Sequence, residues 1–390
     1  MSKTAIEKIG KEKCTGCFAC SNICPVDRAI EMRLDVEGFY KPDITDKCIQ
    51  CGKCQMVCPV INYKSENKLE SFYGAWSLDK DILKNSSSGG IFSEYAKEVF
   101  KVKGKVYGAG WENGELKHMS IGSKEELYKL QGSKYIQSNV GDTYKLIKED
   151  LENDIQVLFV GLACQVAGLY KFLGKEYCNL FTIDLVCHGV PSTKVFHKYV
   201  KELSDTKFIK TNFRDKSTGW IKYSQSYTFD KVNKIMLSKN KDIFFNGFLK
   251  NVYLNTPCYE CQFRGTVNGD KRVADITLAD FWGVPQELYN NLGVSLICIN
   301  NKKGKTFFEN IKSTIISKKV DIEVALKNNS SFYKNSIRNK NRDIFYKNIE
   351  NYNMKELERK YFPQPSLFKR GLNFFKRLVR ELLTKLGVLK

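Results

Sequence analysis

Residues 14–25 read CTGCFACSNICP, and residues 48–59 read CIQCGKCQMVCP. Both runs have the spacing C-x2-C-x2-C-x3-C-P, with which thiolates bind 4Fe-4S clusters. We therefore predict two 4Fe-4S clusters near the N-terminus. Their predicted ligands are Cys14, Cys17, Cys20, Cys24, Cys48, Cys51, Cys54 and Cys58.

The last cysteine of each run is predicted to bind the cluster of the other run. Three thiolates on one short loop reach three irons of a cube, whereas a cysteine held at a proline points to the neighbouring cube. A structural zinc site is the alternative, although zinc sites usually pair two separated Cys-x-x-Cys halves around one ion. The pattern favours a ferredoxin-like module that carries single electrons. The first cluster then takes Cys14, Cys17, Cys20 and Cys58, and the second takes Cys48, Cys51, Cys54 and Cys24.

Length and composition place the chain among globular proteins. Its 390 residues, 42% of them hydrophobic, suffice for two or three domains. The polar N-terminus lacks the apolar segment of a signal peptide, so we expect a cytoplasmic protein with its fourteen cysteines in a reducing compartment, where thiolates bind metal rather than form disulfides. No run approaches the roughly 18 apolar residues of a spanning helix. The net charge of +20 favours anionic partners, but the basic residues are scattered, which argues against nucleic acid.

A stretch rich in serine and glycine, residues 86–90, precedes a pattern typical of a helix. Helix N-termini carry unpaired N–H groups and a partial positive charge, and small residues let a phosphate come close. The residues that we interpret as a loop for the pyrophosphate of a dinucleotide are Ser87, Ser88, Gly89 and Gly90. The alternative is a serine cap after a flexible turn. Lys134 is interpreted as a further phosphate contact, with a surface turn as the equal alternative.

A second group of cysteines follows two predicted strands. Buried runs at 155–160 and 180–186 each lead through a cysteine into a helical segment. Strands separated by a helix are expected to be parallel neighbours, so both cysteines should lie at the carboxyl edge of one sheet, where open sheets bind ligands. With a later Cys-x-x-Cys loop they predict a third 4Fe-4S cluster; a zinc site and a reactive thiol at Cys164 are the alternatives. The predicted ligands are Cys164, Cys187, Cys258 and Cys261.

Jointly, these motifs resemble the coenzyme F420 hydrogenase/dehydrogenase beta subunits, in the form with an N-terminal ferredoxin domain. The resemblance implies that the core domain binds FAD and an iron-sulfur cluster, and that the flavin exchanges hydride with a deazaflavin or a related carrier. In one departure, Ala163 stands where the family often has proline before the strand-end cysteine. The matching stretches are 87–90, 132–135, 160–165, 184–191, 213–216, 258–261 and 274–283.

The sequence shows no Ser-His-Asp triad, paired carboxylates or P-loop, so no side chain is assigned a catalytic role. We expect an oxidoreductase in which FAD trades two electrons with an organic carrier, coenzyme F420 or a related partner or substrate, and passes them singly to 4Fe-4S clusters. The expected redox partner is a ferredoxin, a deazaflavin or another hydride carrier. One alternative is a non-catalytic electron-relay subunit. Another is a reductase of surface-polysaccharide biosynthesis that works without coenzyme F420, since the chain also looks like ferredoxin-fused proteins encoded with such genes.

The expected fold is an α+β ferredoxin-like module with two 4Fe-4S clusters, fused to a mixed α/β flavin and iron-sulfur domain with a C-terminal amphipathic helix. The expected segments are a dicluster domain at 1–62, a flavin-binding domain in two parts at 71–150 and 151–330, the second with the third cluster site, a helical extension at 331–362 and a basic amphipathic tail at 363–390.

In the tail, apolar residues from Phe368 to Leu386 recur at alternating steps of four and three, and basic residues crowd the remaining surface. This pattern predicts a helix that holds the cytoplasmic protein reversibly at an anionic inner membrane face. The alternative is a helix docked on the protein's own core or on a partner.

Overall fold

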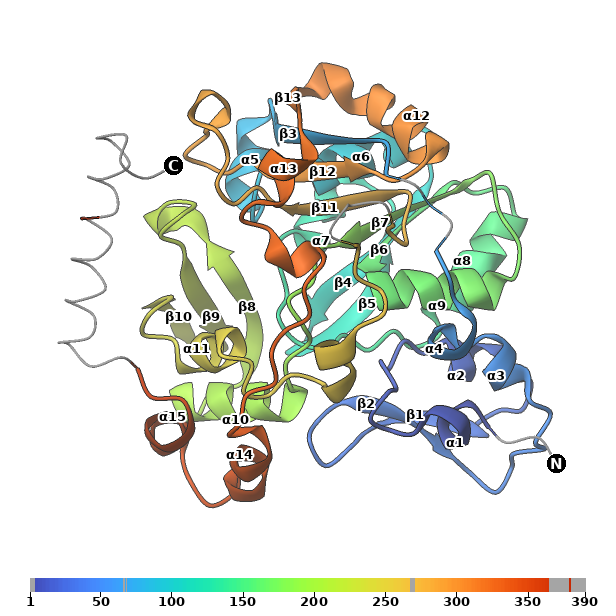
Figure 1. Ribbon diagram of the computed structural model, residues 1–390, viewed down its shortest axis with the longest axis vertical. Coiled ribbons are helices and arrows are strands. Elements are labelled where there is room, and N and C mark those ends of the chain that lie inside the picture. Colours follow the sequence, from blue (N-terminus) through green and yellow to red (C-terminus); the bar gives the residue numbers. More distant parts are fainter. Residues whose placement is uncertain (1–3, 66, 68, 267–270, 365–378, 380–390) are drawn as a thin grey trace.

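An eight-stranded mixed sheet occupies the centre of the chain (Figure 1). The structure is a computed structural model and describes residues 4–65, 67, 69–266, 271–364 and 379. The strand order is β13-β3-β12-β11-β7-β6-β4-β5. The strands are β3 (Ser71–Ser77), β4 (Lys105–Glu112), β5 (Glu115–Ile121), β6 (Val157–Leu162), β7 (Leu180–Leu185), β11 (Ile276–Asp280), β12 (Ser295–Ile299) and β13 (Ile315–Val320).

The centre of this sheet is parallel. β4 pairs with β6, β6 with β7 and β7 with β11 in parallel, and antiparallel pairs flank them on both sides. The pairing of β6 with β7 is the one expected for two buried strands joined by a helix. Along β6, Val157 and Phe159 contact the core on one face and Leu158 contacts the core on the other. Burial on both faces explains why β6 is a continuous apolar run.

Helices cover both faces of the sheet (Figure 1). Leu158 packs with α6 (Ile91–Lys101) and α12 (Lys302–Ile311), whereas Val157 and Phe159 pack with α8 (Thr143–Glu152) and α9 (Ala163–Leu173). In α6, the apolar residues at steps of four form the buried stripe of an amphipathic helix. Shorter helices complete the domain; they are α5 (Lys80–Asn85), α7 (Leu127–Leu130) and α13 (Ile322–Leu326).

A three-stranded antiparallel sheet forms a second, aromatic core beside the central sheet (Figure 1). Its strands are β8 (Phe208–Asp215), β9 (Ser224–Phe229) and β10 (Val232–Ser238). The helices around it are α10 (Thr193–Leu203), α11 (Ile243–Leu249), α14 (Arg342–Asn348) and α15 (Met354–Tyr361). Fully buried rings fill this core; they include Phe196, Phe213, Tyr227, Phe244 and Phe345.

The N-terminal module lies against α8 and α9 (Figure 1). Its helix α1 begins at a capping box, in which Thr4 Oγ1 accepts from Glu7 N and Glu7 Oε2 accepts from Thr4 N. Asn22 Nδ2 donates to Gly141 O at 2.8 Å, so the module is hydrogen-bonded to the domain. Its elements are α1 (Ala5–Ile9), α2 (Ala19–Ile23), β1 (Ile30–Leu34), β2 (Tyr40–Ile44), α3 (Lys53–Met56) and α4 (Pro59–Asn62).

The predicted amphipathic tail at 363–390 lies outside the described residues, apart from residues 363, 364 and 379. Membrane attachment through it therefore stays a prediction. In the described part of the chain, no helix has the length and hydropathy that a membrane crossing requires.

Candidate iron-sulfur and flavin sites

The first predicted cluster site is a cavity inside the N-terminal module. The thiols that line it belong to Cys14, Cys17, Cys20 and Cys58. The first three come from the loop before α2 and from α2 itself, and the fourth stands at the N-cap of α4, directly before its proline. The structure thus brings together the four cysteines predicted to share the first cluster. Apolar side chains line the rest of the cavity; they include Ile9, Met32 and Val60.

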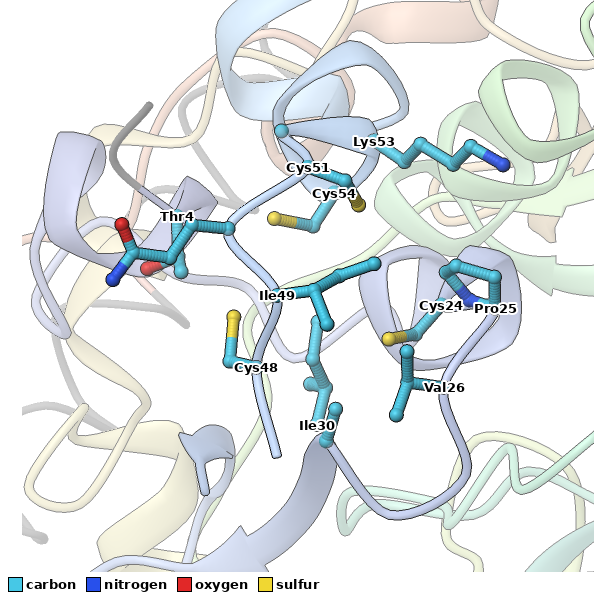
Figure 2. Close-up of a pocket in the computed structure, with 13 residues that line it drawn as sticks. Thr4, Cys24, Pro25, Val26, Ile30, Cys48, Ile49, Cys51, Lys53 and Cys54 are labelled. Atoms are coloured by element: carbon cyan, nitrogen blue, oxygen red, sulfur yellow. The ribbon is translucent and has the colours of Figure 1, made fainter. Parts of the chain in front are cut away.

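The second predicted site is a cavity whose cysteines are Cys24, Cys48, Cys51 and Cys54. Cys24 stands at the C-cap of α2, from which it reaches the second cysteine loop. Figure 2 shows the four thiols around a common space, with Ile49 beside them. Cys51 is exposed, so this site opens to solvent, whereas three of the four cysteines of the first site are buried.

The buried thiol of Cys17 suits metal binding better than a role as a free nucleophile. Burial raises the pKa of the Cys17 thiol to about 12, and the neighbouring Cys58 and Cys14 thiols act in the same direction. Such a thiol stays protonated until an iron replaces its proton. Backbone groups already face the sulfurs, since Ala5 N donates to Cys54 Sγ at 3.3 Å. The residues present therefore fit 4Fe-4S clusters in both cavities.

The third predicted set is also brought together. Cys164 lies in the first turn of α9 directly after β6, and Cys187 follows β7. Cys258 lies in a 3-10 helix, Thr256–Glu260, and Cys261 is its C-cap. Burial raises the pKa of Cys258 to about 12, and the Cys187 and Cys261 thiols add to this. Burial raises the pKa of Cys164, and the thiols of Cys261, Cys187 and Cys258 act in the same direction, so the four thiols lie near one another.

Within the described ranges, no three His, Cys, Asp or Glu side chains converge on a point that could hold a single metal ion. The thiolates of a cube bind different irons and therefore stand farther apart than the ligands of one ion. The ligand assignment of the third cluster stays a prediction.

The first site lies between the other two. Cys54 of the second set contributes to the raised pKa of Cys20, and Cys17 of the first set contributes to that of Cys164. The module and α9 meet closely here, because a Cβ on Gly168 would lie 3.1 Å from Cys17 Sγ. The three sets of cysteines thus form a row of neighbours, in the order second, first, third.

The loop of residues 86–90 leads into α6 as expected and follows α5. Several of its polar groups already form hydrogen bonds within the protein. Gly89 N donates to Ser295 Oγ at 2.9 Å, and Ser88 Oγ donates to Val294 O at 2.7 Å. A Cβ on Gly89 would overlap with the carbonyl oxygen of Ala75, so glycine lets this loop pack against the central sheet. No serine caps α6; its N-cap is Gly90, with φ of 80°.

The phosphate interpretation of this loop finds its support at Lys134. Ser133 N donates to Ser87 Oγ at 2.6 Å, so the two predicted segments touch. The Lys134 side chain is half-buried, and its amine donates to Leu130 O and Gln131 O, at 2.6 and 3.0 Å. Burial lowers the pKa of this amine to about 7. A cation held this way gains from an anionic ligand.

His118 is a neighbour of Lys134 that the sequence interpretation missed. Its two ring nitrogens are buried and have no hydrogen-bond partner. Burial and the Lys134 charge lower the pKa of His118 to about 4, and no carboxylate of the described residues offsets them. The Lys134 amine and an imidazole with unpaired ring nitrogens together fit a phosphate group. The inward position of His118 in the alternating strand β5 is the signal that could have identified it.

Two stretches that carry the family resemblance meet on the other side of the same loop. Arg214 Nη2 and Asp280 Oδ1 form an ion pair at 3.1 Å between β8 and β11. The Arg214 guanidinium lies 3.9 Å from the ring centroid of Tyr223 and 4.8 Å from that of Trp282. Lys216 Nζ donates to Leu83 O in α5 and to Ser88 O in the serine loop, at 2.5 and 3.1 Å, which ties the loop to the helix before it. These contacts were not predicted from residue spacing.

Two family models match parts of this chain. A family model for the C-terminal part of coenzyme F420 hydrogenase/dehydrogenase beta subunits matches residues 154–324, and one described as "4Fe-4S dicluster domain" matches residues 13–62. The second match confirms the prediction that the N-terminal module binds iron-sulfur clusters. Neither match tests the third cluster or FAD.

Two curated relatives are similar to most of this chain. One is a subunit of the F(420)H(2) dehydrogenase of Methanosarcina mazei; it is 26% identical over 276 residues, which are 69% of this chain and 65% of that protein. The coenzyme F420-dependent sulfite reductase of Methanocaldococcus jannaschii is 27% identical over 255 residues, which are 63% of this chain and 37% of that protein. The chain thus spans less than two thirds of the length of either relative.

Among solved structures, the chain is similar to a chain of the F420-reducing [NiFe] hydrogenase complex from Methanosarcina barkeri, in a xenon derivative. The TM-score is 0.45 at 18% identity, over 75% of this chain and 90% of that one. This likeness is too weak to place any residue of the sites.

Proposed function

Because the chain belongs to the family of coenzyme F420 hydrogenase/dehydrogenase beta subunits and carries a 4Fe-4S dicluster domain, we propose that it is an iron-sulfur flavoprotein oxidoreductase. It exchanges two electrons with an organic hydride carrier through FAD, and single electrons through 4Fe-4S clusters. The observation that carries this proposal is the row of three cysteine sets. The row begins at a solvent-exposed site in the module and ends in the domain that holds the serine and glycine loop.

The position of each set suggests its role. Cys51 makes the second site accessible, so this site suits electron exchange with an external protein partner. The first site is buried and lies beside both others, which suits passage of single electrons. Cys164, Cys187, Cys258 and Cys261 would hold the third cluster at the carboxyl edge of the sheet.

FAD, when bound, would supply the conversion between hydride transfer and single-electron transfer. The residues that would hold its pyrophosphate are Ser87, Ser88, Gly89, Gly90 and Lys134. We place the phosphates on the Lys134 side of the loop, because the buried carboxylate of Glu94 already occupies the first turn of α6. His118 would add a hydrogen-bond donor on that side.

Coenzyme F420 is the hydride carrier that we propose, because the names of both relatives contain it. A second candidate function is an electron-relay subunit without its own flavin. The hydrogen bonds that Gly89 and Ser88 make inside the protein favour it, since they leave fewer loop groups for a phosphate.

Metal and flavin analysis of anaerobically purified protein tests these proposals. We expect about twelve irons and as many sulfides per chain, for three cubes, and one FAD. Reduced coenzyme F420 should then bleach the visible iron-sulfur absorption, with NADH as the control donor. Full iron without flavin, and without FAD binding on addition, would favour the electron-relay function. Full flavin with bleaching by NADH alone would exclude coenzyme F420 as the carrier.

A further inference from the structure

Lys41 links the first cysteine set to the third. It lies in β2 and is 5% exposed. Its amine donates to Cys14 O at 2.5 Å and to Asn255 Oδ1 at 3.0 Å, across 214 positions of sequence. Asn255 is the N-cap of the 3-10 helix that carries Cys258, and its carbonyl accepts from Cys258 N at 2.9 Å. One buried amine therefore touches the loops of two sites.

The charge of this amine forms no ion pair. In the described part of the chain, no acidic side chain lies within ion-pair distance of Lys41, and the nearby Glu37 pairs with an arginine instead. The buried lysines of most proteins have such a partner. The backbone carbonyl and the amide oxygen that this amine contacts belong to the loops of two predicted cluster sites.

We propose that Lys41 is a fixed cation shared by the first ferredoxin cluster and the third cluster, and that it raises the reduction potential of both relative to the second. Reduction adds one negative charge to a cube, and a buried cation stabilises that state strongly because little water screens it. The part that concerns the third cluster rests on the proposed function. The part that concerns the first cluster rests only on the dicluster domain.

The consequence is an electron store at the contact between module and domain. Electrons that enter at the exposed second site would be held at the first and third sites. Lys41 would act only through its charge on the reduction potentials of the clusters, without contact to a substrate.

The test is a redox titration of the intact, cluster-loaded protein, followed by electron paramagnetic resonance. We compare Lys41→Met, which removes the charge, with Lys41→Arg, which keeps it, and with Lys53→Met. Lys53 lines the second site but is exposed, and Figure 2 shows its side chain directed away from the thiols. We expect Lys41→Met to lower the reduction potentials of the first and third clusters and to leave the potential of the second cluster unchanged. Lys41→Arg should stay near the wild type, and Lys53→Met should affect at most the second cluster, weakly.

Unchanged potentials in a fully loaded Lys41→Met protein would overturn the proposal and leave Lys41 as a hydrogen-bond donor only. If Lys41→Met does not load iron, Lys41→Gln replaces it, because the amide keeps a donor without a charge. Equal potentials for Lys41→Gln and Lys41→Arg would then overturn the proposal. An iron content of eight per chain would show that the third cluster is absent. A shifted potential of the first cluster in that protein would still support Lys41 as its cation.

Discussion

Arg342 donates to both carboxylate oxygens of Glu37, 305 positions earlier in the chain, with Nη1 at 2.9 Å from Oε1. The arginine side chain is 2% exposed, and its Nε and Nη2 also donate to Leu254 O, at 3.2 and 3.1 Å. Glu37 belongs to the turn between β1 and β2, and Leu254 directly precedes Asn255. One guanidinium therefore fixes the module, the C-terminal helices and the segment of the third cysteine pair relative to one another.

Arg342→Gln should destabilise the protein by about 3 kcal/mol, because it leaves a carboxylate and a buried carbonyl unpaired. The measurement is urea unfolding followed by tryptophan fluorescence. Arg338→Gln is the matched control, since Arg338 pairs with Asp343 at the surface and should contribute less than about 1 kcal/mol. The double variant with Glu37→Gln should cost less than the sum of the single changes. Equal losses for Arg342→Gln and Arg338→Gln would contradict the structural role of the pair.

Cys258→Ser or Cys261→Ser should lower the iron content from about twelve to about eight per chain, while the two ferredoxin signals persist. Cys178→Ser is the control, because Cys178 is exposed and belongs to none of the three sets. Iron analysis and electron paramagnetic resonance provide the readout. If both serine variants keep the iron of the Cys178→Ser protein, the third cluster assignment is wrong.

The cysteine exchange between the two ferredoxin loops was predictable because it depends on short spacings. A proline directly after Cys24 or Cys58 turns the chain away from its own loop, and the structure places each of these thiols in the cavity of the other run. The pairing of β6 with β7 was predictable for a similar reason, since a buried strand, a helix and a second strand leave few topologies.

Contacts between distant segments were beyond the sequence. The sequence around Lys41 or Arg342 contains no pattern that predicts a hydrogen-bond partner more than two hundred positions away. Gly89 shows a related limit, because a glycine needed for close packing on Ala75 looks the same in sequence as a glycine needed by a phosphate. For this reason Gly89→Val would test packing, and Lys134 offers the cleaner test of the flavin proposal.

Lys134→Met should stabilise the flavin-free protein and weaken FAD retention. The folded-state pKa of Lys134 is lowered by burial to about 7, below its usual 10.5, so between these values the unfolded chain binds a proton that the folded chain does not. The stability contributed by this group therefore rises with pH through that window, and the cost of burying the charge is largest below pH 7. Stability measured from pH 6 to pH 10 should rise less steeply in the variant than in the wild type.

The control for this prediction is Lys129→Met, because Lys129 pairs with Glu126 at the surface and should leave the slope unchanged. Tighter FAD binding by Lys134→Met than by Lys129→Met would move the phosphate site away from Lys134. Parallel stability curves for Lys134→Met and the wild type would show that the amine is hydrated in solution.

Gly168→Val should remove the first cluster. Gly168 lies one turn after Cys164 in α9, and a Cβ at this position would stand 3.1 Å from Cys17 Sγ and 3.2 Å from the Tyr144 hydroxyl. The larger valine has to displace the loop of Cys17, so we expect a loss of about four irons with the second cluster retained. Gly168→Ala adds only the Cβ that makes this contact. Alanine stabilises a helix by about 1 kcal/mol relative to glycine, so a loss of iron in this variant would come from the contact with Cys17 and not from a weaker helix. Gly122→Val is the control, because among the described residues no atom beyond its two chain neighbours lies within 4 Å of its Cβ position. Full iron and an unchanged resonance spectrum in Gly168→Val would show that Cys17 and α9 are not in contact in solution, and the row of three sites would then be broken at its centre.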